Sequence, residues 1–121
     1  MPITVQGIYA CAAVSDFERA LAWYGKLMGR QPDDQPFPGM AQWRNMGAAG
    51  VQLWHEPEHA GHGQMTIVVP AMEVEVARLA EAGIVAGPDL GNSAFGVIRQ
   101  VTDPEGNRIT LAEPPKGFVN V

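Results

Sequence analysis

The segment Val14–Gly29, VSDFERALAWYGKLMG, carries the strongest local signals in the chain. Ser15 and Glu18 have the S-x-x-E spacing of a capping box, which marks the start of a helix. Apolar side chains then recur at helical spacing and form one stripe: Phe17, Leu21, Tyr24 and Met28. Gly29 suits the left-handed position that commonly ends a helix. The segment therefore predicts an amphipathic helix that begins after Ser15 and ends at Gly29.

Strand-like segments flank this helix on both sides. Residues 3–14, ITVQGIYACAAV, are rich in β-formers and small residues and predict a buried strand. A proline- and aspartate-rich connection, 31–38, follows the helix. Two further strands are expected at Met40–Met46 and Val51–His55, and the small residues 47–50 between them predict a hairpin turn.

The second half of the chain repeats this order. Gln64–Val69 predicts a strand, and Pro70 suits the first turn of a helix that ends at Gly83. The buried face of that helix is expected to carry Met72, Val76 and Leu79. Three more strands are expected: Ile84–Ala86, Phe95–Thr102 and Arg108–Glu113. Asp103–Gly106, DPEG, has the residues of a type I turn between the last two.

The two halves also match residue by residue at a few positions. Three pairs of like residues stand at a constant offset of 55 positions: Val14 and Val69, Phe17 and Met72, Glu18 and Glu73. The sequence thus predicts one α+β domain over residues 1–121, built from two β-α-β-β-β modules at about 3–56 and 64–113.

Composition excludes several functional classes. A net charge of −5 with only eight dispersed lysines and arginines argues against nucleic acids and anionic membranes as partners. A single cysteine, Cys11, excludes an intramolecular disulfide and fits a reducing compartment. Residues 1–17 lack a basic leader and are not interpreted as a signal peptide. We therefore expect a cytoplasmic protein.

All the histidines lie within residues 55–64, HEPEHAGHGQ, beside two glutamates. Their i, i+4, i+7 spacing would align them on a helix and suggest a metal site: His55, His59 and His62. Pro57 and Gly61 oppose a helix there, so a polar linker with surface histidines is the favoured interpretation. Loop coordination remains the alternative, because His62 lies two residues before the strand that begins at Gln64.

Two segments together resemble the vicinal oxygen chelate superfamily, which includes glyoxalases, bleomycin-resistance proteins and dioxygenases. Val14–Gly29 is similar to its V-x-D-hydrophobic-x-x-(A/S)-x-x-F/W-Y opening, and Asp103–Leu111, DPEGNRITL, to its D-P-D/E-G-N-x-I-x-L hairpin. Phe95-Gly96 stands where members often carry an aromatic–glycine pair. The resemblance spans about residues 5–113. It implies two β-α-β-β-β modules that form an open, cupped mixed sheet with a pocket on its concave side.

The resemblance also implies where a metal would bind. Metal-dependent members place one ligand on each of four strands, and the matching positions here are Tyr9, Gln52, Gln64 and Thr110. Members typically carry His, Gln or Glu there, whereas these four residues supply neither a carboxylate nor an imidazole. Divalent cations need anionic or strongly basic donors to offset lost hydration. We therefore expect no metal at this site and no other cofactor.

The expected ligand-binding residues follow from the same positions: Tyr9, Gln52, Trp54, Gln64, Arg99 and Thr110. Either Arg99 or Gln100 is expected to face the pocket, depending on the hairpin register. Trp43 suits either ligand stacking or the core. Cys11 is expected to be a small buried hydrophobe. The acidic residues of helix starts and turns are interpreted as caps and turn residues: Asp16, Glu18, Glu73 and Glu105.

No nucleophile–base motif, P-loop or dinucleotide fingerprint is present, so no catalytic residue is assigned. The favoured function is a metal-free small-molecule-binding protein that sequesters an aromatic or amphipathic compound and does not turn it over. The alternative is a metal-dependent lyase, isomerase or dioxygenase of the same superfamily with an atypical ligand set. A regulatory or interaction domain is a third possibility. A homodimer is expected, since two-fold contacts are the commonest way to cover apolar surface.

Overall fold

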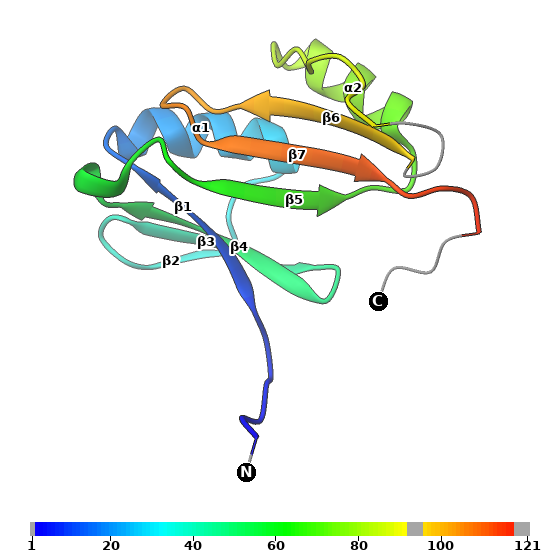
Figure 1. Ribbon diagram of the computed structural model, residues 1–121. Helices are drawn as coiled ribbons and strands as arrows, with labels where there is room; N and C mark the ends of the chain where they lie inside the picture. Colours follow the sequence, from blue (N-terminus) through cyan, green and yellow to red (C-terminus); the bar gives the residue numbers. More distant parts are fainter. Residues whose placement is uncertain (1, 92–95, 118–121) are drawn as a thin grey trace.

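The computed structural model describes residues 2–91 and 96–117, and Figure 1 shows the order of their elements. In each half a strand, then a helix, then further strands follow one another, as the sequence predicts. Their bounds are β1 Tyr9–Val14, α1 Phe17–Met28, β2 Asp34–Phe37, β3 Met40–Met46, β4 Ala49–His55, η1 Pro57–His59, β5 Gln64–Val68, α2 Met72–Glu81, β6 Val97–Thr102 and β7 Arg108–Glu113. Neither helix of this part of the chain is long and apolar enough to cross a membrane.

The strands form two mixed sheets with the same pattern of parallel and antiparallel pairs. The four-stranded sheet has the order β1-β4-β3-β2, and the three-stranded sheet has the order β5-β7-β6. In each sheet the first strand of the half pairs in parallel with its last strand, and the other pairs are antiparallel. The predicted α+β class with two similarly built halves is confirmed.

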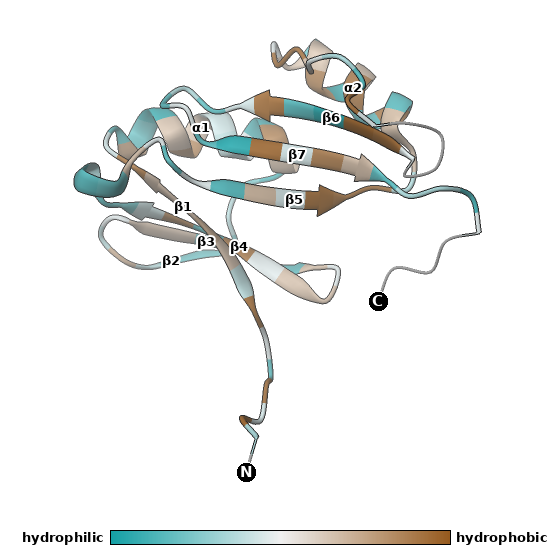
Figure 2. Cartoon of the chain, viewed as in Figure 1, coloured by the Kyte–Doolittle hydropathy of each residue, from teal (hydrophilic) through white to brown (hydrophobic). Residues whose placement is uncertain are grey.

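One hydrophobic core joins the two halves. Because side chains alternate along a strand, Trp43 and Leu53 of one sheet and Ile109 of the other lie on the inner sides of their sheets. They form a single cluster with Tyr24 of α1 and Leu79 of α2. The alternation of apolar and polar residues along β7 is visible in Figure 2. Because the core sides of both sheets converge on the helices, their opposite sides point outward. These outward sides are called the open faces below.

Helix α1 is capped differently from the prediction. The side chain of Asp16 accepts a hydrogen bond from the backbone N–H of Arg19 at 3.2 Å, so Asp16 is the N-cap. Ser15 instead bonds Glu105 of the second half, and the predicted Ser15–Glu18 capping box is wrong. The predicted end is confirmed, since Gly29 has φ +77° in the left-handed region.

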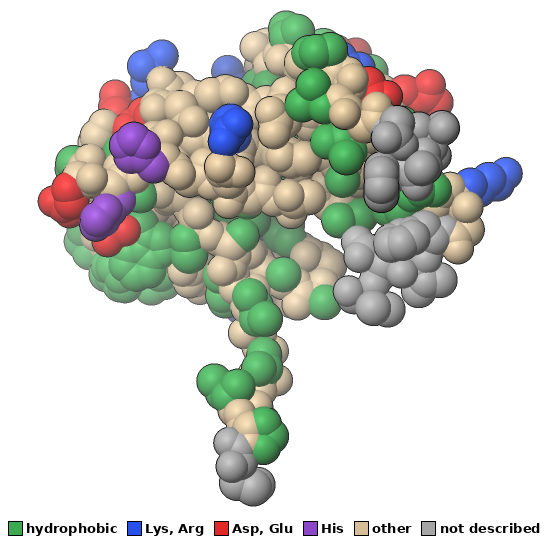
Figure 3. Space-filling view, viewed as in Figure 1, with side chains coloured by type: hydrophobic (Ala, Val, Ile, Leu, Met, Phe, Trp, Pro, Cys, Tyr) green, Lys and Arg blue, Asp and Glu red, His purple; other side chains and the backbone are tan. Residues whose placement is uncertain are grey.

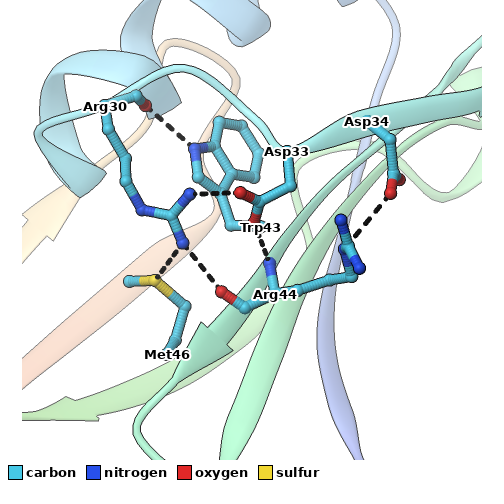
Figure 4. Close-up of polar contacts among 6 residues, drawn as sticks. All are labelled: Arg30, Asp33, Asp34, Trp43, Arg44 and Met46. Atoms are coloured by element: carbon cyan, nitrogen blue, oxygen red, sulfur yellow. Dashed lines mark hydrogen bonds and ion pairs between the residues drawn. The ribbon is translucent and has the colours of Figure 1, made fainter.

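The connection after α1 contains a strand that the sequence did not reveal. Figure 4 shows how it is held against β3. The Arg30 guanidinium donates to Asp33 at 2.8 Å and to the carbonyl of Arg44 at 2.7 Å. The Trp43 indole N–H donates to the carbonyl of Arg30 at 2.9 Å, and Arg44 forms an ion pair with Asp34. These contacts align Asp34–Phe37 with β3, so β2 forms within the predicted connection 31–38.

Three other expectations need correction. Residues 3–8 are exposed and lie outside β1, so only 9–14 of the predicted buried strand are a strand. Ile84–Ala86 is not a strand, although the neighbouring backbone bonds β6 through Gly87 N–H to the Gln100 carbonyl. Helix α2 begins at Met72, so Pro70 precedes its first turn. Of the predicted strand at 95–102, Phe95 lies outside the described residues.

Candidate functional site

The open face of the four-stranded sheet carries a polar and aromatic cluster. Cys11 of β1 lies opposite Gln52 of β4, and Gln52 lies opposite Gln42 of β3. Because every second residue of a strand faces the same side, Trp54 lies beside Gln52. Phe37 of β2 extends the cluster, with its ring centroid 5.5 Å from that of Trp54. We call these five residues, Cys11, Phe37, Gln42, Gln52 and Trp54, the amide–aromatic face.

The amide of Gln52 organises this face. Its Oε1 accepts hydrogen bonds from the Trp54 indole N–H at 3.0 Å and from the Cys11 thiol at 3.4 Å. Its Nε2 donates to Gln42 Oε1 at 3.1 Å. This pattern orients the Gln42 amide so that its N–H donors, which bond no acceptor among the described residues, point away from Gln52. The face therefore offers a neutral donor beside two aromatic rings.

Tyr9 lies on the same side but serves a structural contact. Its ring packs directly over the backbone of Gly50, where any Cβ atom would collide with it. The phenol is 36% exposed, so one edge of the ring remains accessible. Tyr9 thus forms a border of the amide–aromatic face at the start of β1.

The two tryptophans of the middle strands have different surroundings. Trp43 lies on the core side of β3, with 0% of its surface exposed, and packs near Tyr24. Trp43 is therefore a core residue and does not stack on a ligand. Trp54 is half-buried on the open face. Only Trp54 can contact a ligand there.

The open face of the three-stranded sheet is smaller and carries hydroxyls and amides. Thr66 of β5 lies opposite Thr110 of β7, and Gln100 of β6 lies opposite Thr110 on its other side. Gln100 Nε2 donates to Thr110 Oγ1 at 3.1 Å. Gln64 lies two residues before Thr66 on the same side. We call these four residues, Gln64, Thr66, Gln100 and Thr110, the hydroxyl–amide face.

Arg99 does not lie on this face. It pairs with Leu111 on the core side of the sheet, and its guanidinium donates to the carbonyls of Gly87 at 2.6 Å and Ala86 at 3.3 Å. The expectation that Arg99 lines the pocket is therefore wrong. The register of β6 places the side chain of Gln100, and not that of Arg99, on the open face.

The sequence-predicted residues thus fall into two groups, one on each sheet. Tyr9, Gln52 and Trp54 lie on one open face, and Gln64 and Thr110 lie on the other. The core lies between the inner sides of the sheets, and no hydrogen bond joins the two faces within residues 2–91 and 96–117.

Sequence reasoning missed three members of the amide–aromatic face. Gln42 was detectable, because hairpin pairing across the predicted turn at 47–50 places it near Gln52. Phe37 lay in a proline-rich connection with no strand signal. Cys11 was expected to be buried but is exposed, because β1 turns its odd-numbered residues to the open side.

The Cys11 thiol has the properties of a hydrogen-bond donor and lacks those of a nucleophile. Although the residue is exposed, partial burial of its thiol raises the pKa, the hydrogen bond with Trp54 opposes that shift, and the charge of Glu56 adds to it. The thiol therefore stays protonated near neutral pH, whereas a reactive cysteine needs a lowered pKa.

The donor set at the family metal positions does not suit a divalent cation. A phenol, two amides and a hydroxyl at Tyr9, Gln52, Gln64 and Thr110 provide no anionic ligand, and Gln52 Oε1 already accepts two hydrogen bonds. In the part of the chain that the structure describes, no three His, Cys, Asp or Glu residues cluster as metal ligands would. His55 ends β4, where its Nε2 lies 3.1 Å from the Ser15 carbonyl oxygen.

Comparison with known proteins identifies the family of this chain. The family model of the glyoxalase-like domain matches residues 9–112, which is most of the chain. The chain belongs to the glyoxalase-like domain family. No curated protein matches it significantly.

Solved structures extend the family relationship. The chain is 32% identical to a glyoxalase/bleomycin resistance protein from Catenulispora acidiphila DSM 44928, with a TM-score of 0.79, over 92% of this chain and 100% of that chain. It is 26% identical to TnmS3, an antibiotic binding protein from Streptomyces sp. CB03234, with a TM-score of 0.74, over 94% and 98%. A bleomycin resistance determinant encoded on transposon Tn5 shares the fold, with a TM-score of 0.73 at 16% identity over 92% and 98%.

Proposed function

We propose that this chain is a metal-free small-molecule-binding protein that holds an aromatic or amphipathic compound without turning it over. The observation that carries the proposal is the neutral hydrogen-bond network of Gln52 beside the half-buried ring of Trp54 and the exposed ring of Phe37. Small-molecule sites combine apolar and aromatic walls with a few oriented polar groups. The similarity to TnmS3, which is described as an antibiotic binding protein, supports a compound of that kind.

The amide–aromatic face favours a planar ligand with a hydrogen-bond acceptor. A flat ring stacks on Trp54 or meets the edge of Phe37, as aromatic pairs prefer. A carbonyl or hydroxyl oxygen on that ring then accepts a hydrogen bond from the Gln42 amide. Both contacts tolerate an uncharged ligand, since the groups involved are neutral.

We further propose that the binding unit is a homodimer. In one chain the amide–aromatic and hydroxyl–amide faces lie on different sheets, each on the side opposite to the common core. A two-fold partner that sets its hydroxyl–amide face opposite the amide–aromatic face encloses a ligand between them. Two equivalent sites then form in each dimer.

Loss-of-binding variants test the site. Compounds are screened by quenching of tryptophan fluorescence, with product analysis after incubation to detect turnover. Trp54→Ala should weaken binding of a hit by about 1–3 kcal/mol, and Gln42→Ala by about 1 kcal/mol. Val85→Ala, at a site that is 83% exposed and belongs to neither face, is the control and should bind like wild type. Wild-type binding by the Trp54 and Gln42 variants would remove the amide–aromatic face from consideration.

Complementation tests whether the site is shared. A Trp54→Ala chain mixed with a Gln64→Ala chain should form heterodimers with one intact site and one doubly altered site. Binding capacity should then exceed that of either variant alone. If the mixture binds no better than its components, each chain holds its ligand by itself and the shared site is wrong.

A further inference from the structure

A crevice of about 170 Å³ lies between the two halves of the protein, where the end of α1 meets α2 and the two sheets. Four of its lining residues are buried in the common core and come from α1, the residue after β5, α2 and β7: Leu27, Val69, Leu79 and Leu111. Three more are apolar and half-buried: Met28, Met46 and Ile67. The crevice is therefore an apolar space on the core side of both sheets.

The charged groups that line the crevice bind one another and the backbone. Nε and Nη2 of Arg78 each lie 3.2 Å from Glu75 Oε1. The same guanidinium donates to the carbonyls of Lys26 at 3.0 Å and Leu27 at 2.7 Å, so Arg78 connects α2 to the last turn of α1. Because both charges already have partners, the crevice offers no free charge. An ionised ligand would lose its hydration there without compensation.

Met46 and Ile67 line both the crevice and a wider groove beside it. That groove, of about 590 Å³, lies between the β3–β4 hairpin, residues 46–51, and residues 65–68 of β5. Figure 3 shows it as a hollow in the surface with hydrophobic side chains at its margin. The Met46 Sδ accepts a hydrogen bond from the Arg30 guanidinium at 3.4 Å (Figure 4), and its unbranched thioether adapts readily to a neighbour. The Met46 side chain therefore controls the route from the groove to the crevice.

The size and lining of the crevice favour an aromatic ring. Apolar cavities of about 150 Å³ in other proteins stay dry and bind benzene, because they offer water no hydrogen-bond partner. A crevice of about 170 Å³ has room for one such ring. The thioethers of Met28 and Met46 add a preference, since sulfur makes favourable contacts with aromatic rings. A ring is also rigid, so it loses less conformational freedom on binding than an alkyl chain of equal size.

We propose that the crevice is a second binding site, separate from the amide–aromatic face, that takes one uncharged monocyclic aromatic molecule. The bound ring contacts α1 and β3 of the first half and α2, β5 and β7 of the second. It therefore stabilises the folded protein by connecting the halves, as any ligand that binds only the folded state does. The inference does not rest on the function proposed above. The crevice lies on the core side of the four-stranded sheet, whereas the amide–aromatic face lies on its open side.

Titration of benzene into protein with isotope-labelled methyl groups tests the site directly by nuclear magnetic resonance. In wild-type protein, saturable changes in chemical shift should be largest at the methyl groups of Leu27, Ile67, Leu79 and Leu111, with one ring bound per chain. Benzoate has the same ring but carries a charge that the crevice cannot pair, so its affinity should be at least about tenfold weaker. Benzene should also raise the melting temperature of the protein, and benzoate at the same concentration should not.

Variants that fill the crevice identify it as the site. Met28→Trp places an indole in the space and should weaken benzene binding at least about tenfold, because two rings cannot share it. Val74→Trp is the matched control on α2, at a site that is 59% exposed and does not line the crevice, and should bind benzene like wild type. Circular dichroism checks that each variant folds. Ile67→Trp fills the crevice from β5 and replaces Met28→Trp if that variant does not fold.

Trp54→Ala distinguishes the crevice from the amide–aromatic face. This variant removes a ring from that face and should leave benzene binding in the crevice unaffected. The proposal is overturned if the benzene-dependent shifts cluster around Trp54 and disappear in Trp54→Ala, if binding does not saturate, or if Met28→Trp and Val74→Trp weaken it equally. Equal affinity for benzene and benzoate would also contradict it. A failed compound screen at the amide–aromatic face changes none of these measurements, so the failure of one proposal is distinguishable from the failure of the other.

Discussion

The Tyr24 hydroxyl donates a hydrogen bond to Asp103 Oδ2 across 2.8 Å, from α1 of the first half to the turn before β7 of the second. Both groups are buried, and Asp103 also accepts from the backbone N–H groups of Glu105 and Asn107. Asn107 in turn donates to the Ala13 carbonyl at the end of β1. The two halves are thus joined by a polar network as well as by the core.

Removal of the Tyr24 hydroxyl tests the strength of that junction. Tyr24→Phe should lower the free energy of unfolding by about 1–3 kcal/mol, since a buried carboxylate loses one donor. Urea unfolding at neutral pH measures this. Tyr9→Phe, whose hydroxyl makes no hydrogen bond among the described residues, should change stability by less than about 0.5 kcal/mol. An equal effect of both variants would mean that the junction hydrogen bond is not the cause.

Tyr24→Phe should also change how the free energy of unfolding depends on pH in the alkaline range. Burial, followed by the charge and hydrogen bond of Asp103, raises the pKa of Tyr24 above its ordinary value of 10.0. The unfolded chain therefore loses this proton first, and wild-type protein loses stability as the pH rises beyond about 10. Because Tyr24→Phe has no such proton, the stability difference between the two proteins should narrow above that pH.

Glu105 provides an acid-dependent contact between the halves. Burial acts to raise its pKa, but hydrogen bonds from the Ser15 side chain and from the backbone of Asp16 and Ser15 outweigh it and lower the pKa below 4.5. The stabilisation is therefore complete above pH 4.5 and is lost as the pH falls through the lowered value. Glu105→Gln should destabilise by about 1 kcal/mol at pH 7, after allowance for solvent screening, and the difference should shrink as the pH falls below 4.5.

The control for this measurement is Glu58→Gln, which changes a glutamate of η1 that has no hydrogen bond among the described residues. It should show no pH-dependent difference from wild type. If the difference in stability between wild type and Glu105→Gln stays constant as the pH falls through the acidic range until both proteins unfold, the charge of Glu105 is not what stabilises the contact.

Gly50 is required by the close approach of two neighbours. An added Cβ would meet the Tyr9 ring and would lie 2.8 Å from the backbone oxygen of Trp43. Gly50→Ala should therefore destabilise by about 1–3 kcal/mol, as overpacking does, and should displace Tyr9. Gly7→Ala, where the new Cβ meets no atom within 4 Å, is the matched control in thermal unfolding. A neutral Gly50→Ala would show that Tyr9 moves aside freely.

Metal content provides a further test. Untagged protein purified without chelator should contain well under one equivalent of zinc, nickel, iron or manganese by elemental analysis, because neutral side chains at positions 9, 52, 64 and 110 cannot replace the hydration of a dication. Stoichiometric metal that is lost in Tyr9→Phe/Gln64→Ala would reverse the expectation. Loss on replacement of His55, His59 and His62 would instead assign the metal to the loop.

Local signals in the sequence determined most of the fold. The stripe of α1, its end at Gly29 and the D-P-E-G-N turn depend on residues near one another in the chain, and the structure contains each of them. β2 was not predictable in the same way, because Asp34–Phe37 becomes a strand only when Arg30 and Arg44 hold it against β3. Such long-range contacts leave no periodic pattern in a short proline-rich segment.

The candidate site was decided by tertiary structure. The sequence supplied the residue types at Gln52, Trp54, Gln64 and Thr110, and their alternation set which of them share a strand face. It could not reveal that both sheets turn their inner sides to one core, which separates the two open faces. Nor could it decide between Arg99 and Gln100, because a shift of one residue in strand register moves a side chain to the opposite side of the sheet. Side-chain chemistry follows from the sequence, but the direction in which a side chain points follows from strand pairing across the whole fold.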